Sequence, residues 1–579
     1  MSMEKHWFRA LCSLFLFFSF VSLDIIYEDA FIYFRLVEQF AAGYGYVFNQ
    51  LGARVEYCSS VSWPLLLYLG KLLTSWPLVT VAKLLGIALA LINLHLLFRL
   101  STLLLAGAAT RHLPVLLTVT YVPFVLWSQM GLETALYSVL LTALCISLLE
   151  KESQRFFPWM AVALILTRSE GLFFVGGLLA LLAVCCPQRR PMLPRALVCT
   201  SLCVVLLTGF RFFYFHDLLP TPFYNKIGST RFTLQQLHQQ FLWSGIYLLL
   251  LLVLPALVNR HFWGTAQRCL AAVVALSLFW FAYAPDYGPF FRHATYAMPL
   301  LFVFVVTAFE FQVRRWQGSW KRLFHTGFVA YSVSAVSVHA TEFTFGAKVE
   351  NPLAENLMKF FRQPVGRSQF LLGRLFDPDN DEHLNGTASG VYGIGNNCDA
   401  LVGRFVRDNY PAGSTIVYDQ MGQTPYFAGP DRSFLDSWGL VDKKISHYKF
   451  RGNNRESAFY RFFLNTAEYA SSRVFDEQWP ATPSEALDYV FANKPDVIML
   501  HGLILVNGAL KQRLPSLIFD DPRLGERYRL RHTILFTHVY ERTDSIPWTD
   551  EVIIPRGLTV NSTFTHQDLM RMYRQAAPE

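Results

Sequence analysis

Two adjacent carboxylates, Glu28 and Asp29, follow the first long apolar stretch of the chain. Carboxylates this close repel each other, and the repulsion raises the pKa of one of them. A raised pKa suits a group that takes a proton from a substrate. The structural alternative is that Asp29 caps a helix over residues 30–42 and that Gly43 closes its far end. These residues alone do not separate the two interpretations.

The residues after this pair predict an amphipathic helix. Apolar side chains recur at helical spacing, at Phe31, Phe34, Val37 and Phe40. Polar side chains, with Arg35 among them, take the other positions. This pattern is typical of a helix that lies in the membrane interface.

The composition indicates a chain embedded in a bilayer. Of its 579 residues, 53% are hydrophobic and 16% are charged, and the mean hydropathy is +0.30. A soluble globular protein carries about 25% charged residues, so much of this surface must face something other than water. The net charge of +8 comes from Lys and Arg in short runs between apolar stretches. That placement sets membrane topology and gives no reason to expect a nucleic-acid partner.

Apolar stretches of spanning or near-spanning length predict about eleven transmembrane helices. They lie at residues 7–26, 78–100, 113–128, 132–149, 156–168, 171–186, 195–213, 241–258, 268–283, 294–310 and 325–342. The first stretch lacks a small-residue cleavage site, so we interpret it as a retained helix and not as a signal peptide. Residues 60–76 are also apolar, but the stretch is short and interrupted by Pro64, and we interpret it as dipping into the membrane.

The distribution of basic residues predicts the orientation of these helices. Lys and Arg occupy every second connection, at residues 111–112, 151–155, 188–195, 260–268 and 314–322. Those connections should be cytoplasmic. The first loop, residues 27–60, and the C-terminal part would then lie outside.

The composition changes near residue 343, where charged and turn residues become frequent. Residues 415–419 and 495–500 read as short buried strands. Between them, Thr482, Pro483 and Glu485 predict the start of a helix over 483–493, with Thr482 and Glu485 forming a capping box. The predicted fold is therefore a polytopic α-helical membrane domain, residues 1–342, followed by a soluble α/β domain, residues 343–579.

Most of the nine cysteines lie inside apolar stretches and read as small buried side chains. Cys58 and Cys398 lie outside them. A disulfide between these two is one possibility in an oxidising compartment, and two separate thiols are the other.

The first loop resembles that of a known family. Glu28–Arg35, Gly43–Asn49 and Arg54–Glu56 are similar to the first-loop signature of bacterial GT-C glycosyltransferases, a group that includes the mycobacterial terminal arabinofuranosyltransferase. Further matches follow in order at Gly131–Ala135, Leu166–Gly171, Asp217–Lys226, Asp286–Arg292, Asp436–Asp442 and Lys494–Asp496. The resemblance spans roughly residues 24–500. The family often has two aspartates at positions 28 and 29, Arg-Pro-Glu-Gly at 168–171, and Gly-Tyr after residue 56.

The resemblance implies an inverting transfer of a sugar from a polyprenyl phosphate to an acceptor hydroxyl, on the periplasmic side of the bacterial cytoplasmic membrane. Such a reaction needs a base to take the proton of the attacking hydroxyl. It also needs positive groups that stabilise the departing lipid phosphate. Asp29 is the predicted base, with Glu28 as its neighbour, orienting group or alternate base. A divalent cation is possible, although no ligand cluster demands one.

Other site residues are predicted from their places near the outer ends of spans and in the first loop. The candidates for contacts with the donor are Lys226, Arg292, Arg168, His293 and Arg35. The candidates for contacts with sugar hydroxyls or the acceptor are Glu133, Glu170, Glu56 and Tyr33. The structural alternatives are anchoring at the membrane interface for the cations and aromatics, and a pair with Arg168 for Glu170.

The sequence leaves the substrates open. Arabinofuranose is the first expectation from the family, and the acceptor is a cell-surface polysaccharide, a lipid or a protein. A non-enzymatic transporter or regulator of surface organelles is the alternative function. It is disfavoured because the carboxylates lie at the outer boundary instead of mid-span, and because both first-loop acids are present. The sequence has no P-loop, GxGxxG or HExxH motif.

Overall fold

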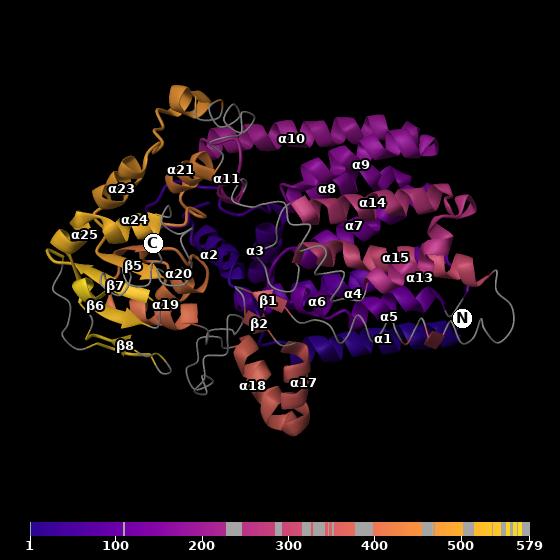
Figure 1. Cartoon of the computed structure of the whole chain (residues 1–579), viewed down its shortest axis with the longest axis horizontal. Coiled ribbons are helices and arrows are strands. Elements are labelled where there is room, and N and C mark those ends of the chain that lie inside the picture. Colours follow the sequence, from indigo (N-terminus) through magenta and orange to yellow (C-terminus); the bar gives the residue numbers. More distant parts are fainter. Residues whose placement is uncertain are drawn as a thin grey trace. The chain divides into compact units, whose positions relative to one another are not determined.

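The fold is taken from a computed structural model of the full chain (Figure 1). The structure describes residues 2–107, 110–226, 246–283, 292–314, 342–344, 347–349, 352–376, 398–453, 469–501, 514–534, 537–545, 552–555, 560–563 and 565–569, with a few isolated positions. Its contacts divide the chain into two compact units. One comprises residues 1–26, 60–205 and 230–377, and the other comprises residues 27–59, 206–229 and 378–579. We call them the helical unit and the sheet unit.

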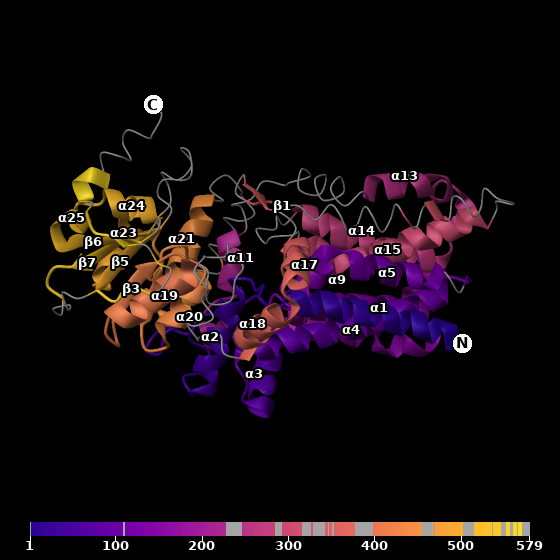
Figure 2. The same ribbon diagram turned by 90° about the horizontal axis from the view of Figure 1, so that it is seen from below.

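The helical unit is a bundle. Its α-helices and the helix that leads out of it are α1 (Ser2–Val21), α3 (Ser62–Thr74), α4 (Leu78–Leu104), α5 (Leu113–Thr120), α6 (Val122–Trp127), α7 (Thr134–Leu149), α8 (Phe157–Thr167), α9 (Gly171–Cys185), α10 (Leu193–Phe215), α13 (Ile246–Leu257), α14 (Thr265–Tyr283), α15 (Arg292–Val313), α17 (Pro352–Arg362) and α18 (Pro364–Phe376). Short 3-10 turns lie at Thr110–His112, Lys151–Phe156, Pro187–Met192 and Arg260–Phe262, and β1 (Glu342–Thr344) pairs antiparallel with β2 (Ala347–Val349). Figures 1 and 2 show that α1, α4, α5, α14 and α15 run roughly parallel to one another.

Apolar length marks several of these helices as membrane spans. Within the described residues, three helical stretches are long and apolar enough to cross a membrane, namely Leu78–Leu104, Pro187–Phe215 and Thr295–Val313. Three shorter apolar helices lie at Thr134–Leu149, Gly171–Cys185 and Thr265–Phe279. Helices lie at the predicted spans, except that 325–342 falls almost entirely outside the described residues. The total of about eleven stays a prediction, as does the orientation.

The prediction of one continuous span over 113–128 is wrong. The chain leaves the helical conformation at Tyr121, which has φ −75° and ψ 100°, and α5 ends there while α6 begins. Pro123 explains the break, because it has no N–H for the preceding turn and its ring clashes with the carbonyl four residues earlier. The apolar stretch at 60–76 forms the 13-residue helix α3, which is shorter than the roughly 20 residues that a span requires.

The sheet unit combines a sheet with surrounding helices. Its helices are α2 (Ala30–Ala41), α11 (Thr221–Lys226), α19 (Cys398–Asn409), α20 (Gln423–Ala428), α21 (Lys443–Asn453), α23 (Pro483–Ala492), α24 (Leu514–Asp520) and α25 (Pro522–Arg527). Its strands are β3 (Thr415–Tyr418), β4 (Ser433–Asp436), β5 (Val497–His501), β6 (Tyr528–Ile534), β7 (Thr537–Arg542) and β8 (Val560–Asn561). They form one sheet in the order β4-β3-β5-β7-β6-β8. The predicted strands at 415–419 and 495–500 are confirmed as β3 and β5.

The direction of the strands divides this sheet into two halves. β3 is parallel to both β4 and β5, whereas β7, β6 and β8 add antiparallel pairs. Val417 and Ile498 from the parallel half pack with Val490 of α23 in the core. The chain passes from β3 to β4 on one side and then returns across to β5 on the other. The carboxyl end of β3 is thus the point at which the connections diverge.

The prediction that residues 30–42 form an amphipathic helix at the membrane interface is wrong in its second part. The helix exists as α2, but nearly all of its residues are buried. Phe31 contacts the rings of Tyr426 and Phe427 of α20, and Phe34 contacts that of Tyr426, at centroid distances of 5.1–6.2 Å. Aromatic side chains of the C-terminal part therefore cover the apolar face of α2.

The N-terminus of α23 follows the predicted capping pattern in part. Thr482 is the N-cap and its side chain accepts a hydrogen bond from the Glu485 N–H at 3.2 Å. Glu485 accepts from the Ala481 N–H at 2.6 Å, one residue before the predicted partner.

Thr482→Ala should raise the rate of amide exchange in the first turn of α23, because one N–H loses its acceptor. The expected loss of local stability is about 1 kcal/mol. Hydrogen–deuterium exchange across residues 481–492 measures it, and Ser484→Ala on the exposed face of the same helix is the control. Equal exchange in the two variants would contradict the capping role.

Candidate active site

Glu28 and Asp29 form the entry to α2 and differ in their surroundings. The Glu28 carboxylate accepts a hydrogen bond from the Gly422 N–H at 3.2 Å. Asp29 occupies the N-cap position of α2, with φ −58°, but its side chain makes no capping hydrogen bond. The capping interpretation of the Asp29 carboxylate is therefore wrong. At the far end of α2, Gly43 adopts the left-handed conformation, φ +88°, as its predicted closing role requires.

Three other carboxylates act on Glu28. Burial, Asp399, Asp29 and Asp419 together raise the pKa of Glu28 well above its ordinary value, while the Gly422 N–H opposes the shift. Burial also raises the pKa of Asp399 to about 6. Glu28 is therefore more readily protonated than an ordinary glutamate. A protonated acid beside a carboxylate is an arrangement that can donate a proton at one atom and accept one at another.

The sheet places these groups at the carboxyl ends of its parallel strands. Asp419 directly follows β3, and Gly422 lies in the short loop between β3 and α20. His501 ends the neighbouring β5, where its Nδ1 lies 3.4 Å from the Tyr418 hydroxyl. In open α/β sheets, ligands bind at the carboxyl ends of strands where the connections diverge. The position of Glu28 is therefore a ligand-binding position of this fold class.

Gly422 is required by the close approach of Glu28. A Cβ at residue 422 would lie 2.5 Å from Glu28 Cγ and 2.5 Å from the Glu28 carbonyl oxygen. Only glycine leaves room for the contact. Nothing in the sequence links Gly422 to Glu28, which lies 394 residues earlier in the chain. Asp399 was missed, because nothing in its neighbourhood marks it as chemical.

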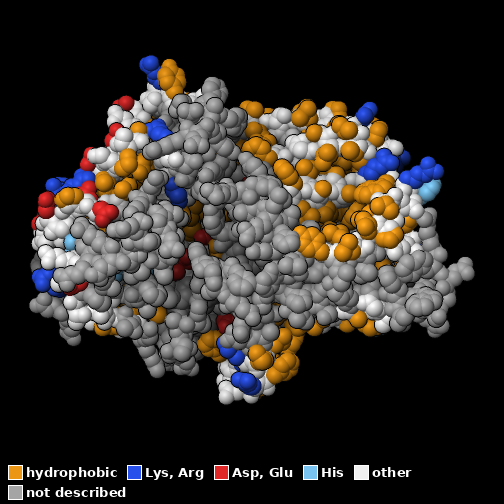
Figure 3. Space-filling model, in the orientation of Figure 1, with side chains coloured by type: hydrophobic (Ala, Val, Ile, Leu, Met, Phe, Trp, Pro, Cys, Tyr) orange, Lys and Arg blue, Asp and Glu red, His pale blue; other side chains and the backbone are white. Residues whose placement is uncertain are grey.

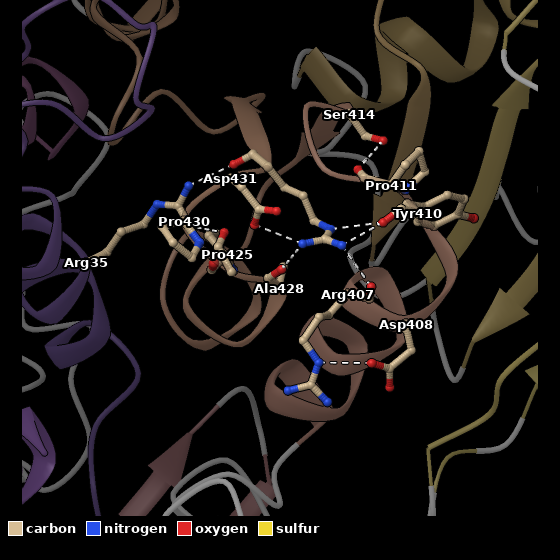
Figure 4. A network of polar contacts seen from close by, with 12 residues as sticks. Arg35, Arg407, Asp408, Tyr410, Pro411, Ser414, Pro425, Ala428, Pro430 and Asp431 are labelled. Carbon is tan, nitrogen blue, oxygen red and sulfur yellow. Dashed lines mark hydrogen bonds and ion pairs between the residues drawn. The ribbon is translucent and has the colours of Figure 1, made fainter. Parts of the chain in front are cut away.

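Arg35 is not a donor-binding residue, contrary to the prediction. Its side chain is buried, and its guanidinium donates hydrogen bonds to the main-chain carbonyls of Phe48 at 2.9 Å, Gly429 at 3.1 Å and Arg432 at 2.8 Å, and also to that of Pro425. Figure 4 shows Arg35 pointing from α2 toward the loop that contains Pro430 and Asp431. Burial lowers the pKa of Arg35 to about 10. Four of the five N–H donors of the guanidinium are occupied by carbonyls.

Glu56 and Tyr33 are also buried by the protein itself. Glu56 forms a two-point ion pair with Arg211, with N–O distances of 2.6 and 2.9 Å, and both side chains are buried. The predicted substrate contact at Glu56 is therefore corrected to a structural ion pair. Tyr33 is buried in α2, and its predicted contact with a substrate stays a prediction.

The helical unit brings five predicted residues together. Glu133 precedes α7, Arg168 and Glu170 lie between α8 and α9, and Arg292 and His293 begin α15. Both arginines pair with Glu133, Arg292 at 2.6 Å. Arg168 also pairs with Glu170 at 2.8 Å and donates to the His293 Nε2 at 3.1 Å. Each arginine charge is thus already compensated by a carboxylate.

A small pocket adjoins this cluster. It is lined by Arg168, Glu170, His293, Tyr137, Tyr296, Phe174 and Ser277. One oxygen of Glu170 and one of Glu133 have no hydrogen-bond partner among the described residues. Burial alone would raise the pKa of Glu170, but Arg168 and His293 lower it to about 2. The pocket wall therefore carries an ionised carboxylate with a vacant acceptor, which suits a hydroxyl-bearing ligand.

Three predictions fall partly outside the described residues or stay untested. The backbone of Lys226 ends α11, but its side chain lies outside the described part. The same holds for the Cys398 side chain, so a disulfide with the buried Cys58 stays a prediction. Within the described ranges, no group of three or more His, Cys, Asp or Glu side chains is arranged to hold a metal ion. The possible divalent cation likewise stays a prediction.

Comparisons with known proteins agree with the helical membrane fold. Residues 392–552 match the family model of a domain of unknown function, DUF8728, and no curated protein matches the chain. Two solved structures of ArnT from Cupriavidus metallidurans are similar to it, one in the apo state and one bound to undecaprenyl phosphate. Each shares 13% identity, covers 93% of this chain and 98% of its own, and has a TM-score of 0.50. ArnT is a GT-C glycosyltransferase, and the similarity shows the GT-C fold.

Arg35→Met should destabilise the packing of α2 on α20, because four buried main-chain carbonyls lose their donor. An unsatisfied buried polar group costs about 1–3 kcal/mol, so we expect a loss of at least about 3 kcal/mol in the free energy of opening these segments. Native-state hydrogen exchange over residues 30–41 and 423–432 measures it. Arg407→Met is the control, because the Arg407 side chain is exposed and pairs with Asp408. Equal effects of the two changes would contradict the account.

Glu28→Gln should change how stability depends on pH. Because the pKa of Glu28 is raised in the folded chain, the native state binds more protons than the unfolded state above the ordinary glutamate pKa of about 4.3, and stability falls as pH rises. Glutamine stays neutral, so the variant should have a higher melting temperature than wild type at pH 7–8 and a similar one near pH 4. Glu38→Gln on the same helix is the control. Parallel pH profiles for wild type and Glu28→Gln would show that Glu28 is not buried among carboxylates.

Proposed function

We propose that the protein is a glycosyltransferase that moves a sugar from a polyprenyl-phosphate donor to an acceptor hydroxyl outside the cytoplasmic membrane. The observation that carries the proposal is the first-loop pair at the carboxyl edge of the sheet. Glu28 is held there by Gly422, and Asp29 beside it makes no capping bond. The GT-C fold, which this chain shares with a protein that was solved bound to undecaprenyl phosphate, supports a lipid-linked donor.

Asp29 is the proposed base. The incoming hydroxyl must lose a proton as its oxygen attacks the anomeric carbon, and an ionised carboxylate within hydrogen-bond reach accepts it. Burial and three neighbouring carboxylates raise the pKa of Glu28, so Glu28 is protonated more readily than an ordinary glutamate, and Asp29 is the preferred base. The proposed role of Glu28 is to orient the Asp29 carboxylate. The electron pair of the breaking bond leaves with the lipid phosphate, and the acceptor is glycosylated with inversion.

The cations proposed for the lipid phosphate differ in how far other groups already pair with them. Arg168 and Arg292 already share Glu133, so either one would have to divide its hydrogen bonds between that carboxylate and a phosphate. Lys226 and His293 are also proposed to bind the lipid phosphate. Glu133 and Glu170 are proposed to bind sugar hydroxyls through their vacant oxygens.

The identity of the sugar and that of the acceptor are more specific proposals. Arabinofuranose follows from the resemblance of the first loop to the mycobacterial group, and the acceptor is a cell-envelope glycan, a lipid or a surface protein. The alternative function is that of a non-enzymatic transporter or regulator with the same architecture. Such a protein would bind polyprenyl phosphates without releasing the sugar from them.

The test offers polyprenyl-phosphate sugars one at a time to the purified chain in nanodiscs. Native mass spectrometry reports donor binding, and release of polyprenyl phosphate reports turnover. Asp29→Asn should bind the same donor as wild type and lose at least about a hundredfold in turnover, the usual size of a general-base contribution. Glu38→Gln, a carboxylate-to-amide change on the same helix, should keep both activities.

Each outcome separates the two functions. Turnover by wild type and loss in Asp29→Asn support the transferase and identify the sugar. Normal turnover in Asp29→Asn contradicts the base assignment. Binding without turnover in wild type, for every donor and acceptor offered, favours the non-enzymatic alternative.

A further inference from the structure

Helices α17 and α18 form a hairpin that is fixed to one end of the helical bundle. Asp24, just after α1, accepts hydrogen bonds from Arg367 at 2.7 Å and from Asn356 at 3.0 Å. Arg367 also donates to Asn356 at 3.0 Å. One acid on the bundle thus holds both helices of the hairpin. Figures 1 and 2 show the hairpin lying across the direction of α1.

Aromatic and aliphatic contacts complete the attachment. Phe360 packs against Phe17 and Phe20 of α1, at ring-centroid distances of 5.6 and 6.1 Å. Leu371 of α18 is buried against Leu23. The inner face of the hairpin is therefore an ordinary apolar contact with the bundle.

The hairpin sits at the level where a membrane span begins. Lys83, near the start of α4, donates a hydrogen bond to the main-chain carbonyl of Ile25, next to Asp24. α4 has 27 residues and is apolar enough to cross a membrane. Trp76, two residues before α4, contacts Phe376 at the end of the hairpin, at 6.1 Å. Tryptophan at the end of a span is typical of the interface between lipid and water.

The outer face of the hairpin is apolar and exposed. Phe361 and Val365 at the hairpin bend are 68% and 72% exposed. Three more large apolar side chains are exposed along the two helices, at Met358, Leu372 and Phe376. Leu72 and Leu73 of α3 are exposed as well. Figure 3 shows apolar and basic side chains side by side on the hairpin where it projects from the bundle.

The charge of the hairpin identifies its partner. Residues 352–376 contain four basic residues, Lys359, Arg362, Arg367 and Arg374, and one acidic residue, Glu355. Lys359 and Arg362 are exposed beside Phe361. Exposed apolar side chains flanked by lysine and arginine are the composition of a helix that lies in the headgroup layer, where each basic residue near anionic lipid contributes about 1 kcal/mol.

We propose that the α17–α18 hairpin is a lipid-binding element that inserts Phe361 and Val365 into the headgroup layer of the bilayer and binds anionic phospholipid through Lys359 and Arg362. The hairpin would then fix the depth and tilt of α1, whose end it holds through Asp24. This is a second lipid contact, independent of any site for a polyprenyl phosphate.

The experiment places the photo-crosslinking residue p-benzoylphenylalanine at position 361, and separately at 365, in the full-length chain. The protein is studied in native membranes and in nanodiscs of phosphatidylcholine with and without phosphatidylglycerol. Mass spectrometry identifies the adduct after irradiation. The same residue at Leu202, exposed on α10, is the lipid-facing control, and at Asp488, exposed on α23, the control on the sheet unit.

The expected result is a phospholipid adduct at 361 and 365 with phosphatidylglycerol preferred, and none at 488. Lys359→Ser with Arg362→Ser removes two basic residues and should lower the ratio of phosphatidylglycerol to phosphatidylcholine adducts by roughly thirtyfold, which is about 2 kcal/mol. A protein adduct in native membranes, or no adduct at either position while 202 is labelled, would overturn the proposal. Equal labelling of the two lipids would overturn the anionic preference. Melting temperatures equal to that of wild type show that the variants are folded.

Discussion

The buried guanidinium of Arg35 is the contact on which the candidate site depends. It joins α2 to the carbonyls of Pro425, Gly429 and Arg432 around α20, across about 390 residues of sequence. With α2 and α20 held side by side, the start of one helix meets the start of the other. Glu28 therefore reaches the Gly422 N–H, and the first loop is presented at the carboxyl end of β3.

Buried charge is handled in two different ways in this protein. Glu56 and Glu133 are matched by arginines, which offset the cost of burying their charges. Glu28 is acted on by three further carboxylates. Placing like charges together costs stability, and strained electrostatics of this kind are characteristic of sites that bind or transform a ligand.

The sequence predicted those features whose cause is local. The presence of helices at the apolar stretches, strands β3 and β5 and the Thr482 cap all follow from periodicity and from residues within one turn. The gathering of Glu133, Arg168, Glu170, Arg292 and His293 also followed, because each lies at the end of an apolar stretch and such ends meet at one boundary.

The sequence could not predict features set by contacts distant along the chain. The sequence suggested that Arg35 binds an anion. Its structural role could not be predicted, because its acceptors are main-chain carbonyls, which have no signature in the sequence. The partner of Glu56, Arg211, lies 155 residues away inside an apolar stretch. The amphipathic pattern of α2 predicted the helix correctly. It could not predict what covers the apolar face, because a bilayer and a folded domain both can.

The central claim is that the loop between β3 and α20 positions the first-loop carboxylates for sugar transfer, and Gly422→Ala tests it most directly. The added methyl group would collide with Glu28 and displace the pair, and a displacement of about 1 Å can cost about a hundredfold in rate. The account predicts that the variant still binds its polyprenyl-phosphate donor while release of polyprenyl phosphate falls by about that factor. Wild-type release from a folded Gly422→Ala protein would contradict it.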